Sequence, residues 1–163
     1  FNELDIGDYR TFYKLNPPLR AESDRQALID ALSAGLVEIV VSAHAPAPAE
    51  DKRLPFDEAT PGAVGLETLL AGLLSLHHEG RVALVDLIRA ATYAPAALLG
   101  LKAGRLAPGA PADLVLCDVD APFVLDADTL LSKSKNSPFD GRRLQGQVLL
   151  TMAGGKVVHQ AQE

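Results

Sequence analysis

The chain has 163 residues, 48% of them hydrophobic, and a formal net charge of −6 at pH 7. This apolar content can form a core and argues against disorder. The acidic balance, without a run of lysine or arginine, argues against a nucleic-acid surface. The apolar stretches are too short to span a bilayer and no signal peptide is visible, so we expect no membrane association.

The single cysteine and the first residue give two further expectations. Cys117 is the only cysteine and cannot form an internal disulfide. We therefore expect a reducing, cytoplasmic location. The chain begins with Phe1 rather than methionine, so we expect a fragment or a processed product.

The first forty residues predict a helix followed by a strand. Ser23 and Gln26 have the spacing of a capping box, apolar residues then recur at helical spacing, and Gly35 is placed to end the helix. Residues 38–42 contain three consecutive β-branched side chains and predict a short, buried parallel strand.

Two more helices are expected after a polar, proline-rich loop. Thr60 and Pro61 can open the first, because proline in the first turn costs no hydrogen bond, and Gly80 can end it. A further helix is expected over about residues 84–93. Helix, buried strand, long loop and helix together predict an α/β fold.

The rest of the chain predicts β structure. Residues 112–118 have the composition of a strand, and residues 147–152 and 156–159 flank a Gly154–Gly155 pair. Two such runs around adjacent glycines are typical of a β-hairpin.

His44 is the first candidate for chemistry. It directly follows the predicted strand, and in an α/β barrel the carboxyl ends of the strands hold the catalytic residues. Two interpretations are equally supported: a functional histidine, or a loop histidine that only bonds a neighbouring backbone group. No two histidines have the spacing of metal ligands, so we expect no metal site in this chain. Gly62 and Gly65 suggest a helix entrance whose free N–H groups can hold an anion.

Four segments in the first part of the chain occur in the order found in dihydroorotases. Residues 16–20, NPPLR, and residues 42–46, SAHAP, resemble the dihydroorotase segments NPPLR and SDHAP. Residues 52–56 and 61–68 resemble the stretch K…PF…PG..GLET.

Two later segments resemble signatures that amidohydrolases share more widely. Residues 104–115 fit the pattern G.L.PG..ADLV, and residues 146–158 fit G.V..T...GK.V. The ordered set covers essentially the whole chain. The sequence therefore resembles the carboxy-terminal portion of a dihydroorotase, in the amidohydrolase superfamily.

The resemblance implies a (β/α)8 barrel with a small β-sandwich-like domain beside it. Residues 1–101 would supply the last strands and helices of the barrel, and residues 102–163 the carboxy-terminal β segment of the small domain. One barrel strand would lead into Asn16 and another would end at Ser42. The missing amino-terminal half of the barrel would be the first partner of this chain. It would also hold the zinc ligands of active full-length members, so no metal ligand or cofactor is expected here.

Two positions depart from the family pattern. Ala43 stands where the family has the aspartate of SDHAP, which the resemblance implies is the general base that contacts the metal. Ala47 stands where many members have a histidine that binds the substrate's carboxylate. No catalytic residue is therefore assigned in this chain. Two origins fit these alanines, natural loss and deliberate substitution.

Four positions still match the family's substrate-binding residues: Asn16, Arg20, His44 and the Gly62 backbone. The resemblance implies that these groups orient the substrate, and they could equally hold loops in shape.

The resemblance also implies a role. The family interconverts carbamoyl-aspartate and dihydroorotate in pyrimidine biosynthesis. A chain that keeps the fold without the base is expected to be catalytically inactive and structural, with aspartate transcarbamoylase as a partner, and to form a homo-oligomer. The alternative is an active zinc-dependent dihydroorotase when the protein is full-length.

Overall fold

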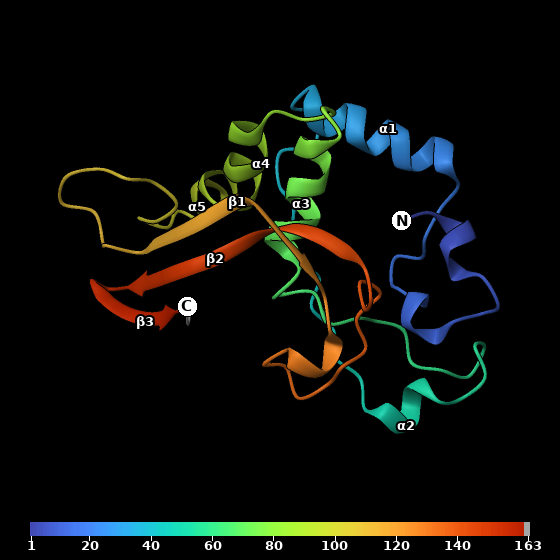
Figure 1. Ribbon diagram of the computed structural model, residues 1–163. Helices are drawn as coiled ribbons and strands as arrows, with labels where there is room; N and C mark the ends of the chain where they lie inside the picture. Colours follow the sequence, from blue (N-terminus) through green and yellow to red (C-terminus); the bar gives the residue numbers. More distant parts are fainter. Residues whose placement is uncertain (162–163) are drawn as a thin grey trace. The chain divides into compact units, whose positions relative to one another are not determined.

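A computed structural model of the chain describes residues 1–161 and divides into two compact units (Figure 1). The first unit comprises Phe1–Ala31, Ser42–Leu69 and Val124–Arg143, and the second comprises Leu32–Val41, Leu70–Phe123 and, of the described residues, 144–161. Helices and strands are mixed, as the α/β prediction required. The division into barrel and small-domain segments at residue 101 stays a prediction.

The first unit consists of short helices and long loops. It contains the 3-10 helices η1 (Glu3–Ile6), η2 (Thr11–Tyr13) and η3 (Ala127–Thr129), the short helix α2 (Ala49–Lys52), and most of α1 (Glu22–Ser33). The loops around Tyr13 pack on aromatic side chains. Its ring contacts Phe1 edge to face, and its hydroxyl donates to the Pro138 carbonyl at 2.9 Å. A buried tyrosine with a satisfied hydroxyl fixes these segments together.

Helix α1 begins at Glu22, two residues before the start at Asp24 that an N-cap at Ser23 predicts. The amides of Asp24 and Arg25 both donate to the carbonyl of Ala21, so Ser23 already lies in the first turn. The capping box predicted at Ser23 is therefore wrong. Gly35 follows the end of the helix with a φ of +72°, a conformation that glycine adopts without strain.

The two barrel strands expected in this chain are not formed. Among residues 1–161, no strand is assigned over residues 38–42, and Val41 is 68% exposed. The segment before Asn16 is the 3-10 helix η2 rather than a strand. A parallel strand needs neighbours to fill its ladder of hydrogen bonds, and β-branched composition cannot supply them.

The helices of the second unit are α3 (Leu69–His78), α4 (Leu84–Ala91) and α5 (Tyr93–Leu98). Helix α3 begins eight residues after Pro61, so the predicted start is wrong. The helix predicted over residues 84–93 is interrupted at Thr92, and α5 carries Pro95 in its first turn, where proline is tolerated. No helix within residues 1–161 is long and apolar enough to cross a membrane.

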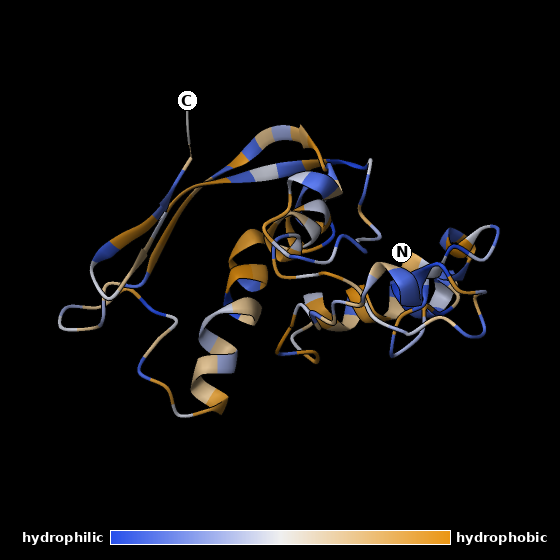
Figure 2. Ribbon diagram, turned by 90° about the horizontal axis from the view of Figure 1, so that it is seen from below, coloured by the Kyte–Doolittle hydropathy of each residue, from blue (hydrophilic) through white to orange (hydrophobic). Residues whose placement is uncertain are grey.

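The sheet of the second unit has the order β1 (Leu114–Val124), β2 (Arg143–Ala153) and β3 (Lys156–Gln160). Strands β2 and β3 pair antiparallel through Gly154 and Gly155, both at positive φ, which confirms the predicted hairpin (Figure 1, towards the red end of the bar). Hydrophobic residues along the strands are interrupted by hydrophilic ones (Figure 2).

A glycine on β2 makes room for the core of this unit. Leu74 of α3 is fully buried, and a Cβ on Gly146 would collide with its side chain. Gly146 also has a φ of +104°. The close approach of the strand to the helix therefore requires glycine at this position.

Candidate functional site

The candidate site is built on two segments of the first unit that run side by side. His44 and Ala63 form a parallel bridge, and the amide of Ala45 donates to the carbonyl of Ala63 at 2.8 Å. A Cβ on Gly65 would collide with the carbonyl oxygen of Ser42. The residues that follow Pro61 thus pair with the SAHAP segment rather than forming a helix entrance.

His44 is half-buried, and its ring is oriented by the backbone of the facing segment. Its Nδ1 accepts from the amides of Gly65, at 3.2 Å, and Leu66, at 3.4 Å. An imidazole nitrogen that accepts is unprotonated, so the ring proton lies on Nε2. The backbone-bonding interpretation of His44 is therefore realised in the structure. Nε2 is left as a donor, which is compatible with a binding role.

The two alanines that depart from the family pattern differ in environment. Ala43 is exposed and has a φ of +45°, a left-handed conformation that non-glycine residues seldom adopt. Ala47 is 3% exposed, and its amide donates to Oδ1 of Asn136 at 3.3 Å. Both side chains are methyl groups that can neither take a proton nor hold an anion.

Gly62 acts through its backbone within the loops. It has a φ of +122°, and a Cβ there would lie 2.7 Å from the carbonyl oxygen of Ala45. Its amide donates to the Lys14 carbonyl at 2.8 Å, and its carbonyl accepts from Nδ2 of Asn136 at 3.1 Å. Because helix α3 begins only at Leu69, the predicted anion site at a helix entrance is wrong here.

Sequence reasoning missed Asn136. Its side chain is 3% exposed and bridges Ala47 and Gly62, while its own carbonyl accepts from the Val64 amide at 3.1 Å. It lies in a polar run, SKSKNSP, that reads as a solvated loop. No periodicity marks such a residue as buried.

Asn16 and Arg20 both precede α1, which begins at Glu22, and both are exposed. The peptide bond between Asn16 and Pro17 is cis. The Arg20 side chain is 70% exposed and lies 3.6 Å from the Asp24 carboxylate, a weak pair. Within the described residues, no hydrogen bond joins either side chain to His44. The shared substrate-binding role of Asn16, Arg20, His44 and Gly62 stays a prediction.

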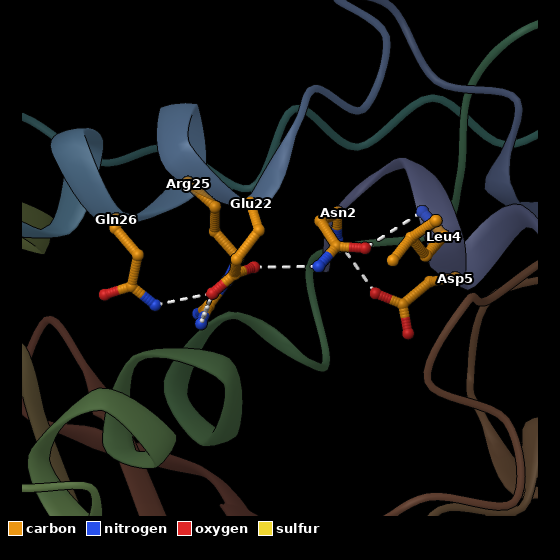
Figure 3. Close-up of polar contacts among 6 residues, drawn as sticks. All are labelled: Asn2, Leu4, Asp5, Glu22, Arg25 and Gln26. Carbon is orange, nitrogen blue, oxygen red and sulfur yellow. Dashed lines mark hydrogen bonds and ion pairs between the residues drawn. The ribbon is translucent and has the colours of Figure 1, made fainter.

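A polar network holds the amino-terminal turn against the start of α1 (Figure 3). Glu22 accepts from Arg25 at 2.8 and 2.7 Å, from Asn2 at 2.7 Å and from Gln26 at 2.6 Å. These donors, Arg25 first, hold the pKa of Glu22 well below its usual value. The network therefore ties Asn2 to the first turn of α1, which directly follows the segment with Asn16 and Arg20.

Asp5 connects this network to Arg142, at the end of the Val124–Arg143 segment of the same unit. Its carboxylate accepts from the Asn2 amide at 2.8 Å and from Arg142 at 2.7 Å. Partial burial opposes ionisation, but the hydrogen bonds from Asn2 and Arg142 outweigh it and lower the pKa of Asp5.

The described residues do not by themselves form a donor set for a zinc ion. Within residues 1–161, no three His, Cys, Asp or Glu side chains gather in a way that could hold a metal. At His44 itself, Nδ1 is occupied by backbone amides and the preceding side chain is a methyl group. Zinc is therefore assigned to no residue here.

Comparisons with known proteins agree on one family. The description "Amidohydrolase family" matches residues 15–158. The chain is 41% identical over 160 residues to a dihydroorotase of Ehrlichia chaffeensis, and 42% identical over 155 residues to one of Desulforapulum autotrophicum. These matches cover 98% and 95% of the chain but only 36% of each relative, so the chain spans about a third of their length.

Solved structures give the same picture. An L-hydantoinase (dihydropyrimidinase) from Arthrobacter aurescens matches all of the chain with a TM-score of 0.93 and 34% identity, over 38% of its own length. A dihydropyrimidinase from Brevibacillus agri matches 96% of the chain with a TM-score of 0.87 and 25% identity, over 36% of its own length. The resemblance to dihydroorotases and the amidohydrolase fold are thereby confirmed.

Proposed function

The chain belongs to the amidohydrolase family, and from this premise we propose that it is part of a dihydroorotase-type cyclic amide hydrolase of pyrimidine biosynthesis. The supporting observation is the identity of 40–42% to proteins named dihydroorotase, along 90% or more of the chain. The reaction would interconvert carbamoyl-aspartate and dihydroorotate.

We propose further that this chain is catalytically inactive. The single observation that carries this proposal is Ala43, a methyl group where the family resemblance places the general base. An alanine side chain cannot accept the proton of an attacking water. A positioned general base is commonly worth a factor of about 10² to 10⁴ in rate, so its absence alone would reduce turnover severely.

The local backbone supports the same proposal. Ala43 keeps a φ of +45°, which aspartate and asparagine tolerate better than alanine does. The loop geometry is thus suited to a side chain that this protein lacks. The neighbouring His44 still presents an Nε2–H donor, so substrate orientation can survive the loss of the base.

The test is carbamoyl-aspartate cyclisation by the longer protein that we propose contains this chain, with added zinc. We expect no measurable turnover from wild type or from Ala43→Asn, which fits the same φ without a base. Ala43→Asp should raise turnover if the remaining part supplies the metal ligands, and Ala47→His should then mainly lower KM. Wild-type turnover of about 1 per second or more would reject the inactive role.

A structural role needs a partner, and we propose aspartate transcarbamoylase and a second copy of the same protein. The support is the loss of the base in a chain that keeps the family fold. Co-elution on gel filtration with light scattering would measure both. A protein that stays monomeric and never co-elutes with aspartate transcarbamoylase would contradict this part of the proposal.

The rival function is an active, zinc-dependent dihydroorotase. The observation that favours it is the high identity to curated dihydroorotases, together with the ordered His44. The cyclisation assay separates the two, because the rival requires wild-type turnover without any reversion at Ala43.

A further inference from the structure

Asn136 contacts both segments of the candidate site at once. Oδ1 of its side chain accepts from the Ala47 amide at 3.3 Å, and its Nδ2 donates to the Gly62 carbonyl at 3.1 Å. Its backbone carbonyl accepts from the Val64 amide at 3.1 Å. Ala47 belongs to the segment that carries His44, whereas Gly62 and Val64 belong to the segment that runs beside it. Asn136 therefore links the two segments on which the candidate site is built.

The direct pairing of these two segments is short. The bridge between His44 and Ala63 is isolated, and the Ala45 amide donates to the Ala63 carbonyl at 2.8 Å. An isolated bridge lacks the neighbouring ladder bonds that fix the register of strands in a sheet. The bonds from Asn136 to both segments supply a constraint that the pairing itself does not.

A side-chain amide is the group that serves both partners of Asn136. The Ala47 amide needs an acceptor and the Gly62 carbonyl needs a donor, and asparagine offers both in one planar group. Aspartate offers acceptors alone, and leucine, of similar shape, offers neither. Asn136 is 3% exposed, so water has little access to replace these bonds. Their loss would leave two buried backbone groups unpaired, which is costly.

The loop that carries Asn136 is also anchored from its exposed side. The Glu67 carboxylate accepts from the amides of Leu131, at 2.8 Å, and Ser132, at 3.0 Å. Asn136 and Glu67 thus hold the stretch from residue 62 to residue 67 near both of its ends. The same stretch supplies the two amides that orient the His44 ring.

We propose that Asn136 is a positioning residue of the candidate site. Its side-chain amide sets the spacing of the two paired segments, and thereby the direction in which the Nε2–H of His44 points. A binding group is effective when neighbours that are themselves locked hold it to within about 0.5 Å of its productive position. The inference rests on the proposed function, because it takes His44 as a group that orients the substrate.

The first test measures dihydroorotate binding by calorimetric titration, in the longer protein proposed above and with added zinc. Asn136→Leu keeps the shape and removes both side-chain bonds, so we expect the dissociation constant to rise by about tenfold or more. Thr11→Val is the matched control, because it removes one side-chain bond to a backbone carbonyl of the same unit, away from the paired segments. It should leave the affinity unchanged. Equal weakening in both variants would overturn the proposal.

A second readout separates positioning from a general loss of stability, and it does not require binding. Nitrogen NMR of the histidine-labelled protein reports which ring nitrogen of His44 carries the proton, and the His44 signals are those that disappear in His44→Gln. In Asn136→Leu we expect the Nδ1 signal to shift as the Gly65 amide moves away from it. Thr11→Val should leave this signal unchanged.

The two readouts can fail separately. A wild-type protein that binds no dihydroorotate would contradict the substrate role of His44 in the proposed function, and the ring signal alone would then decide whether Asn136 positions this residue. An Nδ1 signal that stays unchanged in Asn136→Leu would overturn the present proposal, whatever the binding result.

A variant at the exposed side of the loop replaces Asn136→Leu if that variant does not fold. Glu67→Ala frees the two loop amides that the carboxylate holds, and folding should survive because the contact is exposed. We expect the His44 Nδ1 signal to shift in the same direction as in Asn136→Leu, but less. Glu58→Ala removes an exposed carboxylate of the same unit and is the control. Identical Nδ1 signals in Glu67→Ala and Glu58→Ala would overturn the proposal.

Discussion

Nδ1 of His44 lies 3.2 Å from the amide nitrogen of Gly65 and accepts its hydrogen. The contact joins the SAHAP segment to the segment that runs beside it. It also fixes which ring nitrogen carries the proton. The same imidazole is therefore a structural acceptor on one side and an available donor on the other.

Truncating His44 should loosen the pairing of these two segments. His44→Ala removes the acceptor of both the Gly65 and Leu66 amides, and we expect a loss of about 1–2 kcal/mol in the free energy of unfolding. The amide of Gly65 should exchange its hydrogen faster. His159→Ala, an exposed position on β3, is the control and should be near neutral. Urea denaturation and amide exchange measure the two effects; equal losses in both variants would contradict the expectation.

Position 43 should discriminate side chains by backbone preference. With φ at +45°, Ala43→Val should destabilise the chain by about 1–2 kcal/mol, because a β-branched side chain is strained in the left-handed region. Ala43→Asn should be neutral or slightly stabilising. Ala34→Val, exposed and without positive φ, is the matched control. Thermal or urea unfolding measures the loss of stability in each variant. Equal losses for Ala43→Val and Ala34→Val would refute the conformational explanation.

Gly65 should be intolerant of a single methyl group. Its Cβ would meet the carbonyl oxygen of Ser42, a backbone atom that cannot rotate away, so Gly65→Ala should cost about 2–3 kcal/mol. Gly141→Ala is a useful comparison in the same unit. It has open space but a φ of +73°, so only backbone strain of about 1 kcal/mol is expected. A smaller loss at Gly65 than at Gly141 would contradict the close approach.

The Glu22 network should make the stability of the first unit sensitive to acid. The folded pKa of Glu22 lies below its ordinary value of 4.5, so its stabilising contribution is complete above that pH and is lost as pH falls towards the folded pKa. Wild type should therefore exceed Glu22→Gln in stability at pH 7, and the gap should shrink at about pH 3. Urea denaturation at both values measures the gap.

Glu79→Gln, an exposed carboxylate beyond the end of α3, controls for the general effect of removing a negative charge. An unchanged gap between wild type and Glu22→Gln at the two pH values would show that the network does not titrate as its geometry implies.

The features predicted correctly are those that short-range chemistry determines. The hairpin of β2 and β3 was predicted from two glycines between runs with the composition of strands. The end of α1 was predicted from Gly35, because glycine adopts the positive φ that often follows a helix. Residues 38–42 show the opposite case. Their composition suits a buried strand, but strand pairing depends on distant segments. Here the amide of Val40 donates to the Ala90 carbonyl, at 3.1 Å, instead of to a neighbouring strand.

The candidate site also combines features that the sequence could predict with features that depend on distant segments. Motif order selected His44 and Ala43 as candidate positions, and their roles stay predictions. The positive φ of Ala43, the ring tautomer of His44 and the burial of Asn136 arise from contacts between segments far apart in the chain. A single sequence carries no record of those contacts. The late start of α3 has the same origin, since the residues after Pro61 are already engaged with Ala45.

Among the strands of residues 1–161, β3 lies at the edge of the sheet and pairs with β2. Val157 and Val158 are 52% and 63% exposed. An outer strand presents unpaired N–H and C=O groups along its free side, and apolar side chains make that side adhesive to any other extended chain. Lys156 at the start of β3 is the one charged residue of the strand. A single charge opposes pairing with another chain only weakly. Concentrated solutions of the isolated chain should therefore self-associate by strand addition.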